Sequence, residues 1–232
     1  MNAKGKENVN IPEQCKWLVV YRMNYTEELI TALKAQLQHP LPGWDAQQRM
    51  ATETHRSARL RPPASARQAG VLILLYPGSQ QKLYFPLIQR PTYDGAHSGQ
   101  IAFPGGKVEA QDQDIIDTAL RETQEEIGVT VTRSQVLGRL TDLYIPVSRI
   151  IVSPVVAYTD KVPLYEPDPF EVAATLDVSA YDFLQSQNQS VQTITVRGFT
   201  LDAPSYMIQN QVIWGATAMI LAEFFAVLQE IS

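Results

Sequence analysis

Acidic residues are concentrated in one short part of the chain, residues 103–129, around and after a Gly-Gly pair. Seven carboxylates fall there: Glu109, Asp112, Asp114, Asp117, Glu122, Glu125 and Glu126. Carboxylate oxygens are the hard ligands that Mg²⁺ and Mn²⁺ prefer, so this cluster could hold a divalent cation. With a net charge of -5, this protein would need such a cation to bind anionic phosphates. The alternative interpretation is an ordinary solvated acidic surface.

Helical periodicity divides part of this stretch into an apolar face and an acidic side. Within residues 114–127, at about 100° per residue, one face carries Ile116, Ala119, Leu120, Thr123 and Ile127, and the opposite side carries Glu122, Glu125 and Glu126. Gly128 stands where a C-cap glycine belongs. The (i, i+4) pair of Glu122 and Glu126 costs about 0.2–0.5 kcal/mol on an exposed helix, and its acids lie at the end that the helix dipole disfavours. This unfavourable pattern favours a bound cation.

The spacing of glycine, arginine and glutamates resembles the Nudix box. Gly106 opens the pattern, and it is closed by Arg121, Glu122, Glu125, Glu126, Gly128 and Val129. Three features differ from the box: Asp112 stands where its first glutamate belongs, eight residues instead of seven separate Asp112 from Arg121, and Thr123 replaces an aliphatic residue.

This resemblance implies a Nudix fold of the α+β class, an α/β/α sandwich with a mixed β-sheet between helices. It implies hydrolysis of a nucleoside diphosphate linked to another group, with Mg²⁺ or Mn²⁺ as cofactor. The implied metal ligands are Glu122, Glu125, Glu126 and a backbone carbonyl of Gly105 or Gly106. Arg121 would serve catalysis by orienting the acids. The general base would be a box glutamate, Glu125, or Glu171 from a later loop, where an ordinary exposed acid is the alternative interpretation.

The segment before the box is similar to the upstream signature of coenzyme A pyrophosphatases. The matching residues are Leu87, Arg90, Gly99, Phe103, Pro104, Gly105 and Gly106, and the differing ones are Pro86, Ile88, Pro91 and Gly95. The signature has an arginine where Gly95 stands. The resemblance implies substrate binding by Arg90, Gly99 and Phe103. Arg90 could instead be a surface salt-bridge partner, and His97 is interpreted as an incidental loop residue.

The predicted activity is therefore metal-dependent hydrolysis of coenzyme A or its derivatives to 3'-phospho-AMP and 4'-phosphopantetheine. One alternative is a pyrophosphatase for another nucleoside diphosphate, such as ADP-ribose or a dinucleotide. An alternative of another class is a Nudix module that senses a nucleotide without cleaving it. All three box glutamates are present, which argues against the sensor, and no convincing helix-turn-helix pattern is found.

The elements around the box follow from local patterns. Residues 68–232 are predicted to form the Nudix domain, after an N-terminal helix and irregular segment at 23–67. Strands are predicted at 70–77, 82–90, 100–103, 136–143, 150–158 and 191–196, and a closing helix at 212–231. A helix is predicted from Thr26 to about Pro40, followed by an irregular segment at 44–69. Its arginines, Arg56, Arg59, Arg61 and Arg67, indicate a solvated loop or phosphate contacts.

Composition limits the binding partners and the cellular location that can be expected. The chain has 232 residues and one cysteine, Cys15, which excludes an internal disulfide framework and a cysteine-based zinc site. We expect a cytoplasmic protein with a small-molecule substrate, no nucleic-acid partner and no membrane partner. The apolar last helix indicates either a core element or a homodimer face. Residues 1–22 are polar, and we expect a loose extension or a true start at Met23.

Overall fold

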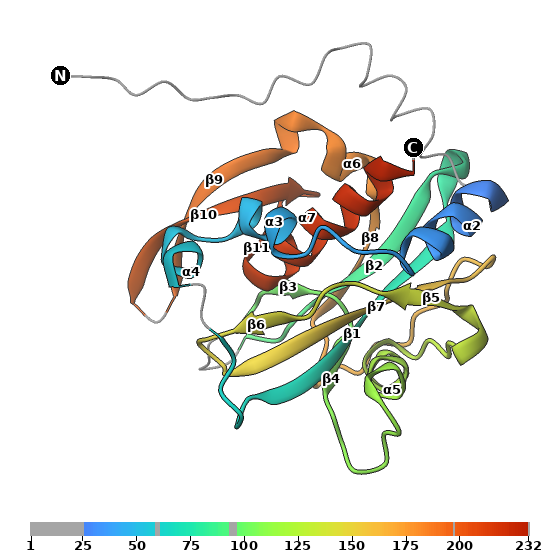
Figure 1. Ribbon diagram of the computed structural model, residues 1–232, viewed down its shortest axis with the longest axis horizontal. Coiled ribbons are helices and arrows are strands. Elements are labelled where there is room, and N and C mark those ends of the chain that lie inside the picture. Colours follow the sequence, from blue (N-terminus) through green and yellow to red (C-terminus); the bar gives the residue numbers. More distant parts are fainter. Residues whose placement is uncertain (1–25, 59–60, 93–96, 197, 232) are drawn as a thin grey trace.

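A computed structural model describes residues 26–58, 61–92, 97–196 and 198–231, and Figure 1 shows their arrangement. The N-terminal extension predicted at 1–22, Arg59 and Gly95 lie outside the described residues. A mixed β-sheet lies between helix α5 (Ile115–Ile127) on one face and helix α7 (Gly215–Glu230) on the other. This arrangement confirms the predicted α/β/α sandwich of the α+β class.

The main sheet has eight strands built around two parallel neighbours, β1 (Arg67–Pro77) and β7 (Ile150–Tyr158). The other strands are β2 (Leu83–Gln89), β3 (Ile101–Ala102), β4 (Gly105–Lys107), β5 (Val136–Arg139), β6 (Leu143–Ile145) and β8 (Ala174–Ser179). Its main path runs β3-β2-β1-β7-β5, while β4 pairs with β1, β6 with β7 and β8 with β2.

One edge of β1 is shared between two partners, and this division positions the Gly-Gly pair. β2 pairs only with the end of β1, at Tyr76 and Pro77, whereas β4 pairs with its beginning, where Val71 faces Gly105 and Gly70 faces Gly106. The parallel strand β7 occupies the other edge. The short strand β4 therefore brings both glycines into the sheet beside α5.

Alternation along β1 builds both layers of the core. Leu72 and Leu74 pack with Ala119 of α5, whereas Ile73 and Leu75 belong to the larger cluster that contains α7. This is the period-two pattern of a strand covered on both faces. Most of α7 is buried in that larger cluster, which places the last helix in the core.

A smaller sheet packs beside α7. Its strands are β9 (Gln189–Val196), β10 (Phe199–Ile208) and β11 (Gln211–Trp214), in the order β11-β10-β9. Other helical elements are α2 (Glu27–Gln36), α6 (Ala180–Leu184), and the 3₁₀ turns η2 (Ser79–Gln81), η3 (Arg133–Gln135) and η4 (Ser186–Asn188). Thr26 caps α2 through its side-chain oxygen, as predicted.

Three predictions about elements were wrong in detail. The segment predicted to be irregular contains α3 (Trp44–Gln47), η1 (Gln48–Met50) and α4 (Glu53–Ala58). Buried Glu223 of α7 explains part of this order, because its carboxylate accepts from Gly43 N–H and from the Gln47 amide. The strand predicted at 136–143 is two strands, β5 and β6, and the last helix begins later because residues 211–214 pair with β10.

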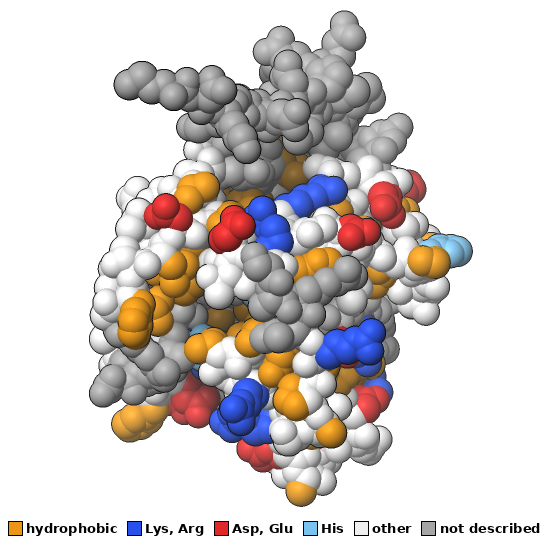
Figure 2. Space-filling view, turned by 60° about the vertical axis from the view of Figure 1, so that its left-hand side comes forward, with side chains coloured by type: hydrophobic (Ala, Val, Ile, Leu, Met, Phe, Trp, Pro, Cys, Tyr) orange, Lys and Arg blue, Asp and Glu red, His pale blue; other side chains and the backbone are white. Residues whose placement is uncertain are grey.

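Charged side chains of both signs are mixed on one face of the molecule (Figure 2). On the face in Figure 2, lysines and arginines are interspersed with acidic side chains instead of forming one basic area. Two of the arginines discussed above bind nearby backbone: Arg56 donates to the Ala51 carbonyl and Arg67 to that of Ser148. Within the described ranges, no helix is long and apolar enough to cross a membrane.

Candidate metal site

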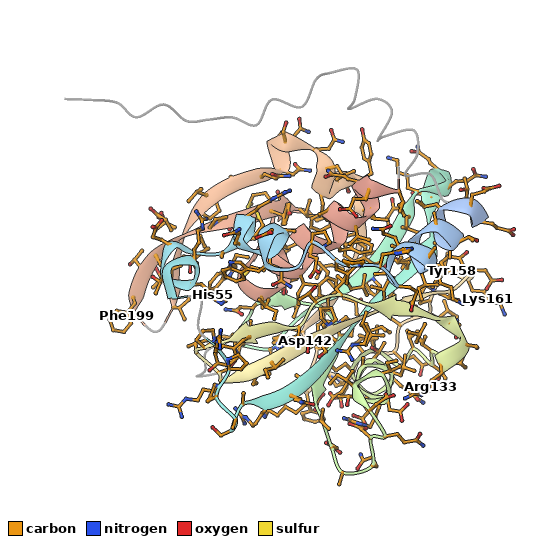
Figure 3. All side chains as sticks on the ribbon, in the orientation of Figure 1. His55, Arg133, Asp142, Tyr158, Lys161 and Phe199 are labelled. Carbon is orange, nitrogen blue, oxygen red and sulfur yellow. The ribbon has the colours of Figure 1, made fainter. Side chains whose placement is uncertain are left out.

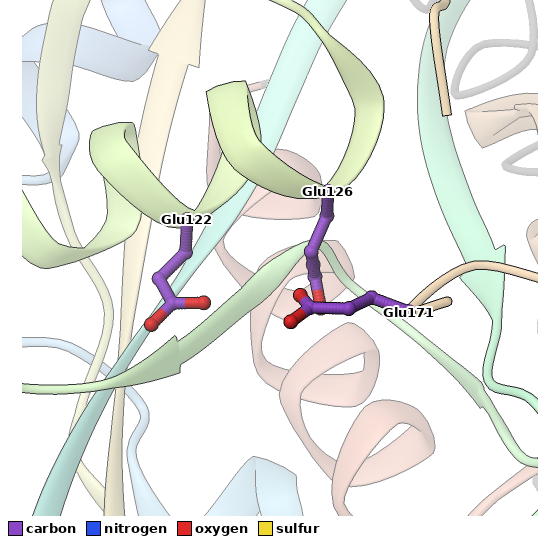
Figure 4. Close-up of side chains that lie close together, drawn as sticks. All are labelled: Glu122, Glu126 and Glu171. Atoms are coloured by element: carbon purple, nitrogen blue, oxygen red, sulfur yellow. The ribbon is translucent and has the colours of Figure 1, made fainter. Parts of the chain in front are cut away.

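Three glutamates from two elements meet beside the Gly-Gly pair. Glu122 and Glu126 come from α5, and Glu171 comes from the loop between β7 and β8 (Figure 4). One carboxylate oxygen of each lies within 4.8 Å of the others. Glu126 is buried, Glu122 is half-buried and Glu171 is exposed. The structure thus brings together two of the predicted box ligands and the predicted loop acid.

Glu126 is the most enclosed of the three carboxylates. It is 4% exposed, and its Oε2 accepts a 2.7 Å hydrogen bond from Gly105 N–H. Burial raises the pKa of Glu126 to about 7, against the opposing effects of that N–H and of the Arg90 guanidinium. A buried carboxylate with so little compensation is costly unless a positive charge accompanies it.

Gly106 lets the backbone approach Glu122 closely. A Cβ atom at Gly106 would lie 2.3–2.4 Å from the carboxylate atoms of Glu122, so a larger residue would displace that carboxylate. Burial raises the pKa of Glu122, while Arg121 lowers it. The contact between β4 and α5 thus sets where this carboxylate lies.

Arg121 holds the acidic side of α5 in place. It makes two bonds to Asp112, from Nε to Oδ1 at 2.9 Å and from Nη2 to Oδ2 at 3.0 Å. Its Nη1 donates to Glu122 and Glu125, at 3.1 and 2.8 Å, and its Nη2 also donates to the Lys107 carbonyl. The guanidinium is thus engaged by protein groups, which agrees with a residue that orients the acids.

Asp112, in the longer loop before α5, binds Arg121. The Asp112 side chain is 2% exposed, and it also accepts from the Thr118 hydroxyl and from Glu109 N–H. The Arg121 guanidinium holds the pKa of Asp112 well below its usual range. Asp112 therefore anchors Arg121 despite its shorter side chain and the extra residue before α5. The sequence places Asp112 at the position of the first box glutamate, but its bonds to Arg121 are seen only in the structure.

Glu125 lies apart from the other box acids. Its side chain is 54% exposed, and its carboxylate pairs at 2.8 Å with Arg121, which lies four residues earlier on α5. It is not one of the three residues whose oxygens cluster within 4.8 Å. The three-residue cluster therefore differs from the predicted box set in containing Glu171 in place of Glu125.

The loop that carries Glu171 is fastened to the end of α5. The last carbonyls of a helix have no partner within the helix, and two of them accept from this loop: Ile127 from Glu166 N–H and Glu126 from Asp168 N–H, both at 2.9 Å. Gly128 ends α5 with φ +73°, and a Cβ there would lie 2.7 Å from Glu166. In the view of Figure 3, Lys161 near the start of this loop lies on the same side as Arg133 and α5.

The residues of the upstream segment differ in their surroundings. Arg90 is half-buried and its Nη2 lies 3.5 Å from the Gly105 carbonyl oxygen, and no ion pair of Arg90 is found among the described residues. Phe103 is 2% exposed and packs against Phe85, so it could reach a substrate only through its backbone. Gly99 has φ +67° and donates to the Pro91 carbonyl, and His97 Nδ1 lies 3.1 Å from Gln100 Oε1.

The carboxylates fit a divalent cation. Mg²⁺ binds oxygen at about 2.0–2.1 Å, so ligands on opposite sides of the ion lie about 4.2 Å apart. The oxygens of Glu122, Glu126 and Glu171 lie within 4.8 Å of one another, close to that spacing. Three carboxylates this close repel one another, and burial of Glu126 strengthens that cost. The donor set and its charge both suit Mg²⁺ or Mn²⁺.

Comparison with known proteins supports this interpretation. The mitochondrial coenzyme A diphosphatase of Mus musculus is 36% identical over 167 residues, which cover 71% of this chain and 78% of the relative. The chain belongs to the Nudix hydrolase family. The family model of the NUDIX domain matches residues 66–179 of the sequence, a range that contains the box and Glu171. The protein is therefore a hydrolase of the Nudix pyrophosphatase type.

Other Nudix relatives extend the match. An uncharacterized Nudix hydrolase of Yersinia pestis (strain Pestoides F), NudL, is 31% identical over 198 residues, covering 85% of this chain and 92% of the relative. The crystal structure of a MutT/Nudix family protein from Enterococcus faecalis has a TM-score of 0.51 at 16% identity, covering 79% of this chain and 72% of that one. This likeness confirms the Nudix fold.

Proposed function

We propose that this Nudix hydrolase cleaves the diphosphate of coenzyme A or its derivatives, giving 3'-phospho-AMP and 4'-phosphopantetheine or its acyl form. The observation that carries the proposal is the cationic side chain of Arg90 beside the Gly105 carbonyl and Glu126, next to the three-carboxylate cluster. A diphosphate needs a metal and a further positive charge to bind near so many acids. The coenzyme A diphosphatase from mouse supports this choice of diphosphate.

The cation would be held by Glu122, Glu126 and Glu171, together with a backbone carbonyl of Gly105 or Gly106. When bound, Mg²⁺ or Mn²⁺ neutralises charge on the diphosphate and lowers the pKa of a coordinated water. Gly105 N–H orients the Glu126 carboxylate, and Arg121 orients Glu122. These contacts hold the ligands before the substrate arrives, which is how positioning contributes to phosphoryl transfer.

The base that takes a proton from the attacking water would be Glu171 or Glu125. Glu171 is exposed and lies in the cluster, so its carboxylate is accessible to water beside the bound diphosphate. Glu125 is also exposed, but Arg121 occupies its carboxylate. The geometry favours Glu171. In the overall reaction one water is consumed, and one bond between phosphorus and the bridging oxygen breaks.

Arg90, beside the Gly105 carbonyl, and the Gly99 turn would contact the substrate. Arg90 N–H donates to the Gln100 carbonyl, which fixes the end of β2 against the segment before β3. Phe103 would keep the following Pro104-Gly105 turn in place by packing in the core. A cytoplasmic setting and a homodimer stay predictions, and the relative from mouse is named mitochondrial.

Product analysis tests the proposed function. The protein would be incubated with coenzyme A, dephospho-coenzyme A, ADP-ribose, NADH and diadenosine polyphosphates, each with Mg²⁺, with Mn²⁺ and with EDTA. We expect metal-dependent release of 3'-phospho-AMP from coenzyme A at least tenfold faster than cleavage of the others, and its loss in Glu126→Gln. Dephospho-coenzyme A differs only in lacking the 3'-phosphate, so its rate shows whether that phosphate is recognised.

The other results separate the alternatives. Faster cleavage of ADP-ribose or a dinucleotide would keep the metal site and overturn the choice of coenzyme A. Nucleotide binding by calorimetry without cleavage of any substrate, with either metal, would identify a sensing module and overturn the enzymatic proposal.

A further inference from the structure

We propose that Tyr165 is a positioning residue whose hydroxyl, bound to Asp177, holds the loop that carries Glu171 in register with α5. This inference rests on the proposed function, because it concerns the placement of one of the three carboxylates. The hydrogen bonds found for the Tyr165 hydroxyl among the described residues go to Asp177 and Tyr76, not to the three carboxylates. Tyr165 acts through the chain between residues 165 and 173.

The hydroxyl of Tyr165 ties the loop to two strands of the main sheet. It donates a 2.5 Å hydrogen bond to Asp177 Oδ1 on β8 and lies 3.3 Å from the hydroxyl of Tyr76 near the end of β1. Tyr76 donates to the same Asp177 oxygen. Two phenols thus share one carboxylate oxygen, which connects β1, β8 and the loop at a single point.

The ring of Tyr165 makes a second, separate contact. It packs against the buried cluster of Ile88, Ile127 and Val172, which come from β2, the end of α5 and the residue directly after Glu171. The ring therefore lies among the elements whose relative placement decides where Glu171 points. Replacing Tyr165 by Phe would keep this packing and remove only the hydroxyl bond.

Backbone bonds transmit the position of Tyr165 to Glu171. Glu166 and Asp168, the next residues along the loop, donate their N–H groups to the last turn of α5. The Asp168 carbonyl accepts from Glu171 and Val172, at 3.1 and 2.8 Å, which closes a tight turn around Glu171. Ala173 N–H then donates to the Gln89 carbonyl of β2.

Glu171 depends on this backbone because its side chain has little other support. It is exposed, and within the described part of the chain no hydrogen-bond donor to its carboxylate is found. Its charged neighbours Glu122 and Glu126 repel it. A loosened loop would let the Glu171 carboxylate move away from them into solvent, and the cation site would lose its third carboxylate.

The test compares Tyr165→Phe with Tyr84→Phe in the full chain. Tyr84 is the matched control, since its hydroxyl lies 3.0 Å from Ser79 Oγ, in a turn outside the Glu171 loop. For each protein, Mn²⁺ binding is measured by electron paramagnetic resonance, loop opening by amide exchange of the peptide covering 160–173, and folding by thermal melting. The Mg²⁺ concentration for half-maximal activity and kcat are measured with whichever diphosphate the wild type cleaves.

In Tyr165→Phe we expect about three- to tenfold weaker Mn²⁺ binding and a similar rise in the half-maximal Mg²⁺ concentration, the range that one hydrogen bond supports. Exchange of the 160–173 peptide should rise, with the melting temperature close to that of Tyr84→Phe. Activity should recover at saturating Mg²⁺. Unchanged Mn²⁺ binding and unchanged exchange would overturn the proposal.

Tyr76→Phe gives a second comparison within the same cluster. It removes the other phenol from Asp177 Oδ1 but leaves the bond of Tyr165, so Mn²⁺ binding should stay near the wild-type value. An equal loss in both variants would show a general effect on the sheet and overturn a specific action of Tyr165. If the wild type cleaves no diphosphate, the proposed function fails, while Mn²⁺ binding and amide exchange still decide the action of Tyr165.

Discussion

On the α5 side of the carboxylate cluster, Glu126 is 4% exposed and receives a hydrogen bond from Gly105, whereas on the loop side Glu171 is exposed. Glu122 and Glu126 stand on one continuous helix, and Arg121 and Asp112 brace it from the side. Glu171 stands on a turn that is held by backbone bonds to α5 and β2 and by the hydroxyl of Tyr165.

The two sides of the cluster position their carboxylates in different ways. On the α5 side, burial and fixed donors set the position of each carboxylate, so a small change there should be strongly felt. On the loop side, the carboxylate can exchange with water and its charge is screened by solvent. Such an arrangement suits a group that accepts a proton and then releases it.

The largest effect is expected for Glu126→Gln. Loss of the buried charge should lower kcat by about 10²–10³-fold, the range for removing one preorganised electrostatic group from an active site. Folding should be retained, because the amide oxygen can still accept from Gly105 and the burial cost of a charge is removed. Steady-state kinetics and thermal melting in EDTA check both points.

Glu125→Gln is the matched control for that variant, since Glu125 is the adjacent acid but is 54% exposed and paired with Arg121. We expect its loss to be about tenfold, as for a residue that supports the ligands from outside. Equal losses in Glu125→Gln and Glu126→Gln would contradict the distinction between buried and exposed box acids.

Gly106→Ala should be the next largest effect on activity, with little loss of stability. Its Cβ would meet the end of the flexible Glu122 side chain, which can move aside at low cost in folding energy. A shift of about 1 Å in a catalytic group can cost about 10²-fold in rate. Kinetics and urea unfolding measure the two quantities separately.

Gly70→Ala offers the contrasting case. Its Cβ would lie 2.7 Å from the Ile115 carbonyl and 3.0 Å from Ala119 N, both backbone atoms of α5. This variant should lose stability because α5 must move away from β1. If Gly106→Ala unfolds as easily as Gly70→Ala, the contact with Glu122 is a packing constraint and the predicted separation is wrong.

Asp112→Asn tests the brace behind α5. We expect a loss of about 3 kcal/mol in the free energy of unfolding, the low end for a broken buried pair, because Arg121 keeps two other carboxylates. Activity should fall by about tenfold or more, as for groups that orient metal ligands. Asp142→Asn is the control, because its pair with Arg139 is exposed and such pairs contribute about 0–1 kcal/mol.

The stability that Asp112→Asn removes should depend on pH. The pKa of Asp112 is lowered in the folded protein, whereas the unfolded value is about 3.9. Its ionised form therefore contributes stability that is present above about pH 4 and is lost as the pH falls through the lowered folded pKa. The difference in unfolding free energy between wild type and Asp112→Asn should shrink from about pH 6 to about pH 3. A constant difference would contradict the charge on Asp112 as its source.

Local signals explain what the sequence could predict. The periodicity of residues 114–127 predicts α5, and Gly128, the predicted C-cap, ends it with φ +73°. The strand predicted at 150–158 coincides with β7, whose long apolar run is covered on both faces. Each of these elements depends on residues that are neighbours in the chain.

Contacts between distant residues explain what it could not predict. β10 and β11 are defined by pairing with each other, and α3 is held by Glu223, which lies about 180 residues away in the chain. Glu171 could be named through the family resemblance. Its placement beside Glu126 depends on the carbonyls of α5, on Gln89 and on Tyr165. No local pattern contains that information.

Of the two substitutions within the cluster, Glu171→Gln on the loop side should have the smaller effect. Glu171 would be both a ligand and the base, but it is exposed, so water can replace part of each contribution. We therefore expect kcat to fall by about tenfold, below the roughly 10²–10⁴-fold loss of a base that nothing replaces, and the half-maximal Mg²⁺ concentration to rise by about tenfold. Glu166→Gln is the control, an exposed acid of the same loop that lies outside the cluster and should leave both values unchanged. A loss in Glu171→Gln as large as in Glu126→Gln, independent of Mg²⁺, would show that the exposed carboxylate is indispensable as the base. The two sides of the cluster would then differ in burial but not in their importance for catalysis.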